Sequence, residues 1–588
     1  MTAKPQSVLN IRLPVWRARL LVTLMFLGFM ALAARALYCQ SVNKDFLQAE
    51  AEKRYSRTKS LIATRGLITD RNGEALAITT AVETVTVNPR RINFESISTE
   101  KLSQLSNLLE LDTDFLKKQL NKKNKGEVYL KRQIPPSLAK KVMLLEIPGL
   151  GLKTTYKRYY PNGEATAQLV GITNIDQQGQ EGIEYSYQKT LAGKSGSRRI
   201  NKNKLNQVIE EVATISNAEN GAELALSIDR QLQYVAYSEA KNAVLEHEAK
   251  SASVVVLDVI TGEILTVANW PSYNPNNRST FKNQASMRNR AVVHQFEPGS
   301  TLKPFTIAAA LEGKFVTPAK LIDIEGGQLR IGRRNIKDDH FENNLLTVSD
   351  VVKTSSNVGT AKISQMMEPT QLWSTLSKSG FGQLPTHQFP GGARGVLRLP
   401  ESWREIHRAT ISYGMGMSAS LLQLARAYSI FARGGTLVPV TFERRSAPAE
   451  GRRVISEHTA RAVLKMLETV THEGGTGLSA AIPGYRVAGK TGTAKVAAGG
   501  SYARGKYRSS FVGIAPVSNP RIIVAVMVEE PSGSYYASVV AAPVFRKVME
   551  EALKTLGIDP DGIDPDGIDP DGIDLDQEVK RFVAPGPV

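Results

Sequence analysis

Residues 296–305 read FEPGSTLKPF and are followed by an apolar run over residues 307–311. The Pro298-Gly299 pair predicts a turn that opens a helix, with Ser300 in the first helical turn. Lys303 lies three residues later on the same helix face, within reach of the Ser300 hydroxyl. The positive end of the helix dipole would stabilise negative charge developing on that oxygen. This stretch therefore predicts a serine nucleophile paired with a lysine.

A lysine acts as a general base only when burial or a neighbouring cation lowers its pKa. The sequence therefore predicts a second cation beside Lys303. A helix cap followed by a surface lysine also produces the pattern Ser-x-x-Lys, so the pair needs support from elsewhere in the chain. Two later segments supply that support, Ser355-Ser356-Asn357 and Lys490-Thr491-Gly492-Thr493.

In this order, the three segments resemble the active-serine penicillin-recognising proteins, whose motifs are Ser-x-x-Lys, Ser-x-Asn and Lys-Thr-Gly. The resemblance implies that Ser300 is the nucleophile and forms an acyl-enzyme, with Lys303 as its general base. Ser355 is then expected to relay a proton between the nucleophile, the lysine and the leaving amine. Asn357 is expected to hold the peptide backbone of the substrate.

The third motif completes the catalytic site that the resemblance implies. Lys490 is expected to be the second cation, and the hydroxyls of Thr491 and Thr493 to bind a substrate carboxylate. Gly492 would let its strand pass close to the substrate, where a β-carbon would obstruct it. The backbone N–H groups of Ser300 and Thr493 would form an oxyanion hole, worth roughly 3 kcal/mol per donor.

Three upstream segments resemble the non-catalytic pedestal of class B, monofunctional penicillin-binding proteins. They are residues 65–77 (RGLITDRNGEALA), 158–161 (RYYP) and 179–184 (GQEGIE). We interpret them as structural, with a turn at Asn72-Gly73 and with arginine and aspartate side chains that pair to fix the pedestal. The resemblance extends from the N-terminal apolar segment to about Leu556.

The distribution of β-rich and helical segments predicts an α+β fold for the C-terminal half. Residues 253–258 and 263–268 form one predicted strand pair, and residues 510–515 and 521–528 form a second. Helical patterns such as 421–432 lie between the two pairs. This arrangement predicts an antiparallel sheet covered by helices, preceded by a mixed α/β pedestal.

The N-terminal region predicts a membrane anchor. Residues 20–38 are almost entirely apolar and, as a helix, would reach roughly 28 Å, enough to cross a bilayer core. Basic residues without any acidic residue precede this span, which predicts a cytoplasmic N-terminus and a periplasmic catalytic domain at the inner membrane. A signal peptide cleaved near residues 31–33 is the alternative, and either interpretation exports the rest of the chain.

Composition excludes several other classes of protein. The 588 residues are 42% hydrophobic and 22% charged, values typical of globular proteins with two or three domains. The net charge of +18 comes from scattered lysines and arginines without any nucleic-acid-binding motif, so we expect no nucleic acid as a partner. We attribute the positive charge to a location close to anionic lipid or an anionic wall polymer.

The seven histidines lack metal-ligand spacing, and no phosphate-binding loop is present, so we expect neither metal nor cofactor. Cys39 is the single cysteine, so no intrachain disulfide can form.

The tail repeats the unit Gly-Ile-Asp-Pro-Asp from Gly557, which predicts disorder, and it lacks the ligand spacing of a calcium-binding EF-hand loop. The predicted organisation is a cytoplasmic tail (1–19), a transmembrane anchor (20–38), a periplasmic stalk (39–60), a pedestal or dimerisation domain (61–217), a penicillin-binding transpeptidase domain (218–556) and a disordered tail (557–588).

The function implied by the resemblance is that of a peptidoglycan D,D-transpeptidase, which cross-links stem peptides ending in D-Ala-D-Ala and is a target of β-lactams. No glycosyltransferase motif precedes the catalytic domain, so a membrane-embedded glycan polymerase and division proteins are expected partners. Residues 355–359 (SSNVG), 535–536 (YY) and 542–545 (APVF) resemble the cell-division type. Residues 412–416 (SYGMG) resemble a family segment beside the active site, or are a plain glycine loop.

Five alternatives are considered on the sequence alone. An elongation-type transpeptidase and a D,D-carboxypeptidase would use the same motifs. A class A β-lactamase would carry Glu-x-x-x-Asn between the second and third motifs, which is not found, and a β-lactam sensor would normally carry several membrane spans. A non-catalytic scaffold would keep the fold and bind division or elongation proteins.

Overall fold

The computed structural model describes residues 14–92, 97–202, 208–282, 284–339, 343–498 and 501–562. Most of the predicted cytoplasmic tail (1–13) and most of the predicted disordered tail (563–588) lie outside the described residues. The chain divides into two compact units: Met1–Ala63 with Gly193–Asn220, and Thr64–Ala192 with Gly221–Val588.

The first unit contains the predicted apolar helix and a small sheet. Helix α1 (Val15–Ser41) has 27 residues and buries none of the side chains in its apolar stretch, so its length and composition suit a single membrane span. The polar segment after it forms α2 (Lys44–Tyr55) and then turns into strand β1 (Ser56–Leu61). β1 pairs antiparallel with β6 (Gly196–Lys202), which pairs antiparallel with β7 (Val208–Ser216).

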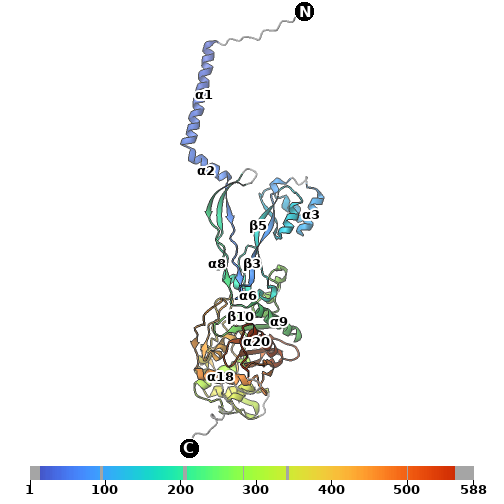
Figure 1. Cartoon of the computed structure of the whole chain (residues 1–588), viewed down its shortest axis with the longest axis vertical. Coiled ribbons are helices and arrows are strands. Elements are labelled where there is room, and N and C mark those ends of the chain that lie inside the picture. Colours follow the sequence, from blue (N-terminus) through green and yellow to red (C-terminus); the bar gives the residue numbers. More distant parts are fainter. Residues whose placement is uncertain are drawn as a thin grey trace. The chain divides into compact units, whose positions relative to one another are not determined.

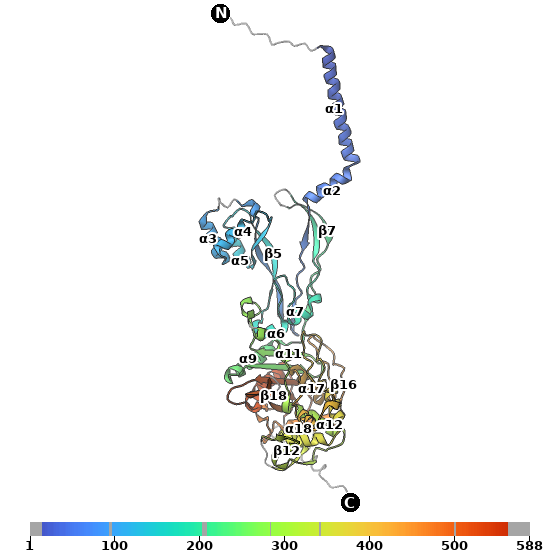
Figure 2. The same cartoon turned by 180° about the vertical axis from the view of Figure 1, so that it is seen from behind.

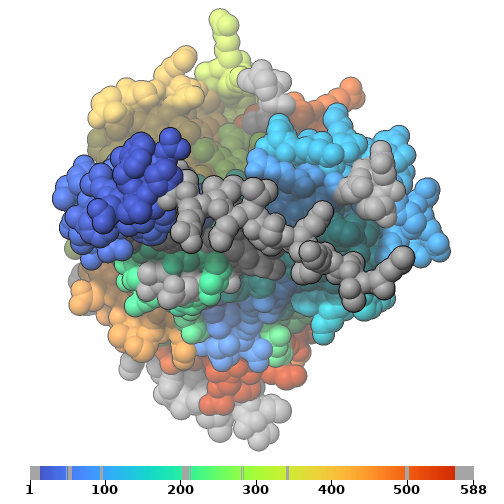
Figure 3. Space-filling view, turned by 90° about the horizontal axis from the view of Figure 1, so that it is seen from above, coloured from blue at the N-terminus to red at the C-terminus, as the bar shows by residue number. Residues whose placement is uncertain are grey.

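The second unit begins with a mixed α/β part built around one long strand, β3 (Ala75–Val87). β3 pairs antiparallel with β5 (Leu150–Tyr159) along most of its length, and the two run together as a ribbon in both views (Figures 1 and 2). At one end of this ribbon, three short amphipathic helices and β4 enclose a separate apolar core, and this lobe is light blue in Figure 3. The elements not yet given bounds in this part are β2 (Ile68–Thr69), η1 (Pro89–Arg91), α3 (Thr99–Leu109), α4 (Thr113–Leu120), β4 (Val128–Ile134), α5 (Pro136–Met143), η3 (Gly163–Ala165), α6 (Ala167–Val170), α7 (Gly182–Ser186), α8 (Gln188–Leu191) and β8 (Leu224–Ala225).

The C-terminal part of the second unit is organised by a five-stranded antiparallel sheet, which confirms the predicted α+β fold. Its strand order is β10-β9-β19-β18-β17. The predicted first pair is β9 and β10, the predicted second pair is β18 and β19, and β19 joins the two pairs by lying beside β9. Their bounds are β9 (Ser251–Asp258), β10 (Ile264–Trp270), β17 (Ala488–Ala498), β18 (Ser501–Ala515) and β19 (Ile522–Glu529).

Helices cover both faces of this sheet. Every residue of β19 is buried, and its side chains alternate between two apolar cores. Ile522 and Val524 pack with α9 (Arg230–Glu246) and α20 (Ala542–Thr555), seen in Figure 1. On the opposite face, Ile523 packs into the core formed with α12 (Lys303–Glu312), α17 (Leu421–Ala432) and α18 (Glu457–Thr469), labelled in Figure 2. A strand buried on both sides reads as a continuous apolar run, as residues 521–528 do.

The segments between β10 and β17 form the helical layer that carries the predicted catalytic motifs. Its elements, with the short α19 that follows β19, are η4 (Arg278–Lys282), α10 (Gln284–Met287), α11 (Arg290–Val293), η5 (Gly299–Leu302), α12 (Lys303–Glu312), β11 (Leu321–Asp323), η6 (Glu325–Gly327), β12 (Gln328–Ile331), β13 (Arg334–Lys337), β14 (Leu345–Thr347), α13 (Val348–Lys353), α14 (Asn357–Gln365), α15 (Pro369–Lys378), η7 (Pro400–Ser402), α16 (Glu405–Ser412), α17 (Leu421–Ala432), β15 (Thr436–Leu437), β16 (Arg452–Arg453), α18 (Glu457–Thr469), η8 (Leu478–Ala480) and α19 (Ala537–Val540).

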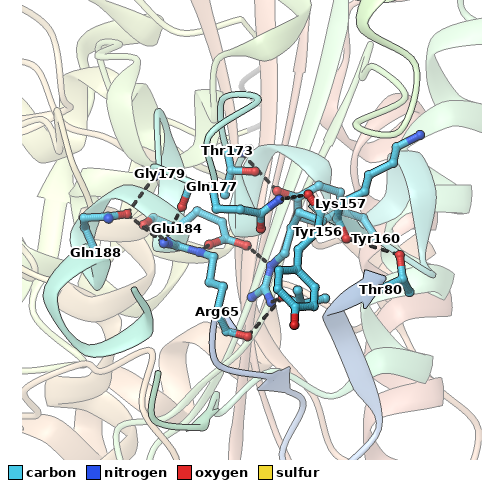
Figure 4. Close-up of polar contacts among 12 residues, drawn as sticks. Arg65, Thr80, Tyr156, Lys157, Tyr160, Thr173, Gln177, Gly179, Glu184 and Gln188 are labelled. Atoms are coloured by element: carbon cyan, nitrogen blue, oxygen red, sulfur yellow. Dashed lines mark hydrogen bonds and ion pairs between the residues drawn. The ribbon is translucent and has the colours of Figure 1, made fainter. Parts of the chain in front are cut away.

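The three pedestal boxes meet in a buried ionic cluster, shown in Figure 4. Glu184, which is fully buried, accepts from Arg65 Nε at 2.5 Å and from Arg158 Nε at 2.7 Å. Arg65 also donates to the backbone oxygen of Glu184 at 2.7 Å and to the side chain of Gln188 at 2.8 Å. Because each box contributes one member, the cluster ties together residues more than a hundred positions apart in the chain.

The ionic partners of the arginines in the three boxes are glutamates and not the expected aspartates. Arg65 pairs with Glu184, and Arg71 pairs with the buried Glu263 of the C-terminal part at 3.2 Å. Asp70 instead accepts backbone N–H groups, including that of Asn72, and so closes the turn of the first box. A short aspartate is well suited to caps and turns, whereas the longer glutamates reach a guanidinium across the interior.

Candidate active site

Ser300 lies on a tight turn that leads into a buried helix. The turn is η5, and α12 continues from it at Lys303. Gly299 has a positive φ of 59°, which a glycine adopts without strain. The neighbouring residues of the turn are buried, whereas Ser300 is partly exposed. The turn therefore presents the serine at the surface of an otherwise buried segment.

Lys303 is fully buried beneath this turn. Its Nζ donates to the Ser355 hydroxyl at 3.2 Å and also to the Ser355 backbone oxygen. Burial lowers the pKa of Lys303 from 10.5 to about 7, and the nearby Asp338 and Asp339 carboxylates oppose that shift. A lysine with this pKa is substantially neutral near pH 7 and can accept a proton.

Ser355 sits in the turn between α13 and α14 with a φ of 64°. The left-handed region is unfavourable for a residue with a β-carbon, and such strain clusters at functional sites. In this conformation both the hydroxyl and the backbone oxygen of Ser355 face the same ammonium of Lys303. The first and second motifs therefore meet through Lys303 and Ser355.

Asp338 holds the second motif in place, and the sequence analysis missed it. Its carboxylate accepts from the Ser356 hydroxyl at 2.6 Å, from the Val358 N–H at 3.0 Å and from the Asn357 N–H. These donors lie at the largely buried N-terminal end of α14, where a carboxylate is stabilising. Asp338 lies 18 positions before Ser356, with β14 and α13 between them, so no local pattern in the sequence connects it to the motif.

Asn357 itself occupies the first turn of α14. Its side-chain amide donates to the Lys337 backbone oxygen at 2.9 Å. Lys337 ends β13, so this bond joins the second motif to the small β12–β13 hairpin. The amide is thereby fixed in orientation at a partly exposed position.

Lys490 on β17 is also fully buried, and burial lowers its pKa well below the usual value, with the charge of Lys303 as a second cause. Its Nζ donates to the Thr491 hydroxyl at 3.4 Å. The charge of Lys303 therefore acts on Lys490, the residue expected to be the second cation. Burial, one of the two causes that the sequence analysis allowed, is the cause that lowers the pKa of Lys303.

The remaining residues of the third motif lie along β17 in register with β18. Thr493 pairs with Ser509. Thr491 shares a hydrogen bond of 2.8 Å with Thr476, a residue of the loop before β17 that the sequence analysis did not single out. No motif marks Thr476, because a threonine in a glycine-containing loop is common.

Gly492 also has close neighbours within the chain itself. A β-carbon at this position would lie 2.6 Å from the Ser510 hydroxyl oxygen, 2.8 Å from a methyl carbon of Thr301 and 3.2 Å from the Pro298 backbone oxygen. The close neighbour is therefore the turn that carries Ser300, together with β18. Gly492 lets the nucleophile turn pack directly on β17, rather than making room for the substrate alone.

The segment 412–416 lies beside the nucleophile turn, which favours the first of its two interpretations. Gly299 donates its N–H to the Gly414 backbone oxygen at 3.1 Å. A β-carbon on Gly414 would lie 2.2 Å from the Gly299 oxygen, and φ of Gly414 is +84°. The carboxylate of Glu297 accepts a hydrogen bond from the Gly416 N–H at 2.7 Å. The loop 412–416 therefore packs directly against the turn that carries Ser300.

Comparison with known proteins identifies the family. The family described as Penicillin binding protein transpeptidase domain matches residues 252–550, and the one described as Penicillin-binding Protein dimerisation domain matches residues 60–226. The chain belongs to the class B penicillin-binding proteins. It is 39% identical to the Probable peptidoglycan D,D-transpeptidase PenA of Neisseria meningitidis, over 90% of this chain and 91% of that protein.

Other relatives agree with this assignment. The class B chain is 38% identical to Peptidoglycan D,D-transpeptidase FtsI of Escherichia coli K12, over 93% of each protein. The apo structure of the TP domain of penicillin-binding protein 3 from Burkholderia pseudomallei is 43% identical, with a TM-score of 0.53, and covers 57% of this chain and 98% of that one. This penicillin-binding protein is therefore a peptidoglycan D,D-transpeptidase, an enzyme of the serine acyltransferase type that acts on peptidoglycan stem peptides.

Proposed function

We propose that this penicillin-binding protein cross-links stem peptides during septal wall synthesis through an acyl-enzyme on Ser300. The observation that carries the assignment of residues is the buried Lys303, whose pKa is lowered to about 7 and whose ammonium contacts Ser355 beside the nucleophile turn. The relatives named FtsI, together with the segments resembling the division type, support the septal role.

Acylation follows from the roles proposed for the first two motifs. Neutral Lys303 takes the proton of the Ser300 hydroxyl as its oxygen attacks the carbonyl carbon between the two terminal D-alanines. The resulting tetrahedral oxyanion accepts hydrogen bonds from the backbone N–H groups of Ser300 and Thr493. The C–N bond then breaks, and protonated Lys303 returns its proton through the Ser355 hydroxyl to the departing D-alanine amine, which leaves Lys303 neutral.

Transfer uses the same groups in reverse. The amine of a neighbouring strand loses a proton through Ser355 and Lys303 as it attacks the ester carbon, and the Ser300 oxygen leaves with a proton. In this scheme Lys490 is the second cation beside Lys303, the hydroxyls of Thr491 and Thr493 bind the substrate carboxylate, and Asn357 orients the peptide backbone. Each of these side chains lies on β17 or at the start of α14.

The location proposed is the inner membrane, with α1 as an uncleaved anchor, its N-terminus in the cytoplasm and the catalytic part in the periplasm. The basic residues before the span and the absence of acidic ones there support this orientation. A membrane-embedded glycan polymerase and division proteins remain the proposed partners. We also propose that the chain after the anchor consists of a stalk (39–60), a pedestal (61–217), a catalytic domain (218–556) and a tail (557–588).

The test of Ser300 is covalent labelling of the full chain, in detergent micelles, with a fluorescent penicillin. Stable label is expected on the natural protein and on Ser402→Ala, an exposed serine that serves as control, and none on Ser300→Ala. Label that persists on folded Ser300→Ala protein would overturn the assignment of the nucleophile. Label that forms and is lost within seconds would indicate a hydrolase, such as a β-lactamase.

The septal role has its own test. Depletion of the protein in its native cell is expected to give filaments, because septal cross-linking would stop while elongation continued. Rounded cells would instead assign it to elongation. Stem peptides trimmed to tetrapeptides without cross-links, found on incubation with lipid-linked substrate and a polymerase, would favour a D,D-carboxypeptidase.

A further inference from the structure

The last described residues of the chain, 557–562, pack against the surface of the C-terminal part. They read GIDPDG and follow α20 almost directly. Their polar partners are residues 484–486, just before β17, and Ser518, in the loop between β18 and β19. All of these partners are exposed or half-buried even with the segment in place. The groups that hold the segment therefore lie at the surface, where another peptide can reach them once it departs.

The carboxylate of Asp561 makes the most specific of these contacts. One of its oxygens accepts from the Arg486 N–H at 2.7 Å, and the other accepts from the Ser518 N–H at 2.9 Å. Hydrogen bonds from backbone N–H groups to a carboxylate are charge-assisted and stronger than neutral ones. An asparagine has no charge and only one oxygen, so it is a poorer acceptor for the two N–H groups. The contact therefore selects an aspartate.

The other residues of the segment are held as well. The Gly562 N–H donates to the Gly484 oxygen at 2.9 Å, and a β-carbon on Gly562 would lie 2.8 Å from the Gly484 carbonyl carbon. The Ile558 oxygen accepts from the Tyr485 hydroxyl at 2.7 Å, and the Ile558 side chain packs at the edge of an apolar core. A β-carbon on Gly484 would lie 3.7 Å from that of Pro560. The contacts thus involve the isoleucine, the proline, the second aspartate and the last glycine.

The sequence contains this hexapeptide three times. GIDPDG occupies residues 557–562 and recurs at 562–567 and 567–572, beyond the described residues, whereas residues 572–577 read GIDLDQ. Each copy supplies the same four contacting residues. Binding a later copy adds only five or ten residues of surface loop before it, a small entropic cost. A ligand tethered so closely is present at a high effective concentration.

We propose that residues 484–486 and Ser518 form a docking site for the hexapeptide GIDPDG, and that its three copies are interchangeable occupants of this site. When 557–562 departs, the carboxylate of Asp566 or Asp571 takes the place of that of Asp561. Occupancy ties the segment that leads into β17 to the loop between β18 and β19. The proposal is independent of Ser300 and of the septal role, because none of the docking residues belongs to the catalytic motifs.

The test measures binding of the synthetic hexapeptide, labelled with fluorescein at its N-terminus, to the full chain in detergent micelles by fluorescence anisotropy. In the natural protein the tethered copies compete with the peptide. In the variant with Asp561, Asp566, Asp571 and Asp576 all changed to Asn, the dissociation constant is expected to fall about tenfold or more. In Asp561→Asn alone it is expected to stay within about twofold of the natural value, because the later copies still compete.

Controls locate the binding at the docking site. The labelled peptide Gly-Ile-Asp-Pro-Asn-Gly is expected to bind the fourfold variant about tenfold more weakly than the natural hexapeptide. Tyr485→Phe, added to the fourfold variant, removes the hydroxyl that donates to the peptide and is expected to weaken binding about three- to tenfold. Tyr185→Phe, an exposed tyrosine elsewhere on the same unit, is the matched control and is expected to leave binding unchanged.

The possible outcomes separate the two parts of the proposal. Equal dissociation constants for Asp561→Asn and the fourfold variant, both below the natural value, would show that only 557–562 docks and would overturn the interchange. Undetectable binding to the fourfold variant, or equal binding of the aspartate and asparagine peptides, would overturn the docking site itself. Because penicillin labelling of Ser300 is read separately on each variant, failure here is distinguishable from misfolding and from failure of the proposed catalytic roles.

Discussion

The pedestal and the catalytic site both bury two cationic side chains, but they treat the charge in opposite ways. In the pedestal, Arg65 and Arg158 share the buried carboxylate of Glu184. In the catalytic site, Lys303 and Lys490 are equally buried, and neither makes an ion pair within the described part of the chain. Burial instead lowers the pKa of both lysines.

The difference follows from the two side chains. A guanidinium stays protonated at any ordinary pH, so burying it requires a counter-ion, and the product is a fixed structural link. An ammonium can lose its proton when buried, and the product is a base. The same physical act, removal of a cation from water, therefore yields a structural cluster with arginine and a reactive group with lysine.

The largest effect is expected when the buried lysine of the catalytic site is replaced by an arginine. Lys303→Arg restores a permanent charge and removes the proton acceptor, so the rate of penicillin acylation at Ser300 is expected to fall about 10²- to 10⁴-fold. The rate is measured by stopped-flow labelling. Lys303→Met removes both the proton acceptor and the charge, and its acylation rate is compared with that of Lys303→Arg. An acylation rate for Lys303→Arg within threefold of the natural one would exclude Lys303 as the base.

A second test removes the shared counter-ion of the pedestal. Glu184→Ala leaves two buried guanidiniums without their carboxylate, and is expected to lower the free energy of unfolding by about 3–5 kcal/mol. Urea denaturation measures this loss. The acylation rate of the folded fraction is expected to remain unchanged, because Glu184 contacts no residue of the catalytic motifs. A loss below 1 kcal/mol would mean that water or another ligand already compensates these charges.

A third test concerns the packing between the nucleophile turn and β17. Gly492→Ala places a methyl group 2.6 Å from the Ser510 oxygen and 2.8 Å from a Thr301 carbon, so the turn must shift. The expected cost is about 1–3 kcal/mol of stability, together with slower acylation. Gly126→Ala is the control, since its β-carbon meets no atom within 4 Å. Acylation at the natural rate in Gly492→Ala would show that the turn tolerates displacement.

The smallest expected effect is a shift in pH dependence. The base is the neutral form of Lys303, so the acylation rate is expected to rise as pH increases through about 7 and then level off. Asp339 raises the pKa of Lys303, so Asp339→Asn is expected to move this rise to lower pH. The measurement is the acylation rate from pH 5 to 9. A rise centred near pH 10 would mean that Lys303 keeps an ordinary pKa.

The local patterns of the sequence identified much of the fold and the candidate site. Alternation and apolar runs predicted the strand pairs 253–268 and 510–528, which form one sheet, because burial on each face is encoded residue by residue. The order of the three motifs indicated that Ser300, Lys303 and Lys490 belong to one catalytic site. The apolar segment at the N-terminus predicted α1, since length and composition alone decide whether a helix can span a bilayer.

Other features exist only in three dimensions. The partner of Arg65 is Glu184, 119 positions away, and the carboxylate that accepts from the first N–H groups of α14 belongs to Asp338 in a preceding loop. Neither pairing follows a sequence period, because charge pairing depends on distance in space. The sequence motif identified Lys303 as the candidate base, but its pKa is lowered only because the fold buries it. The composition around Ser300 determines which groups are available, and tertiary burial decides which of them carry charge.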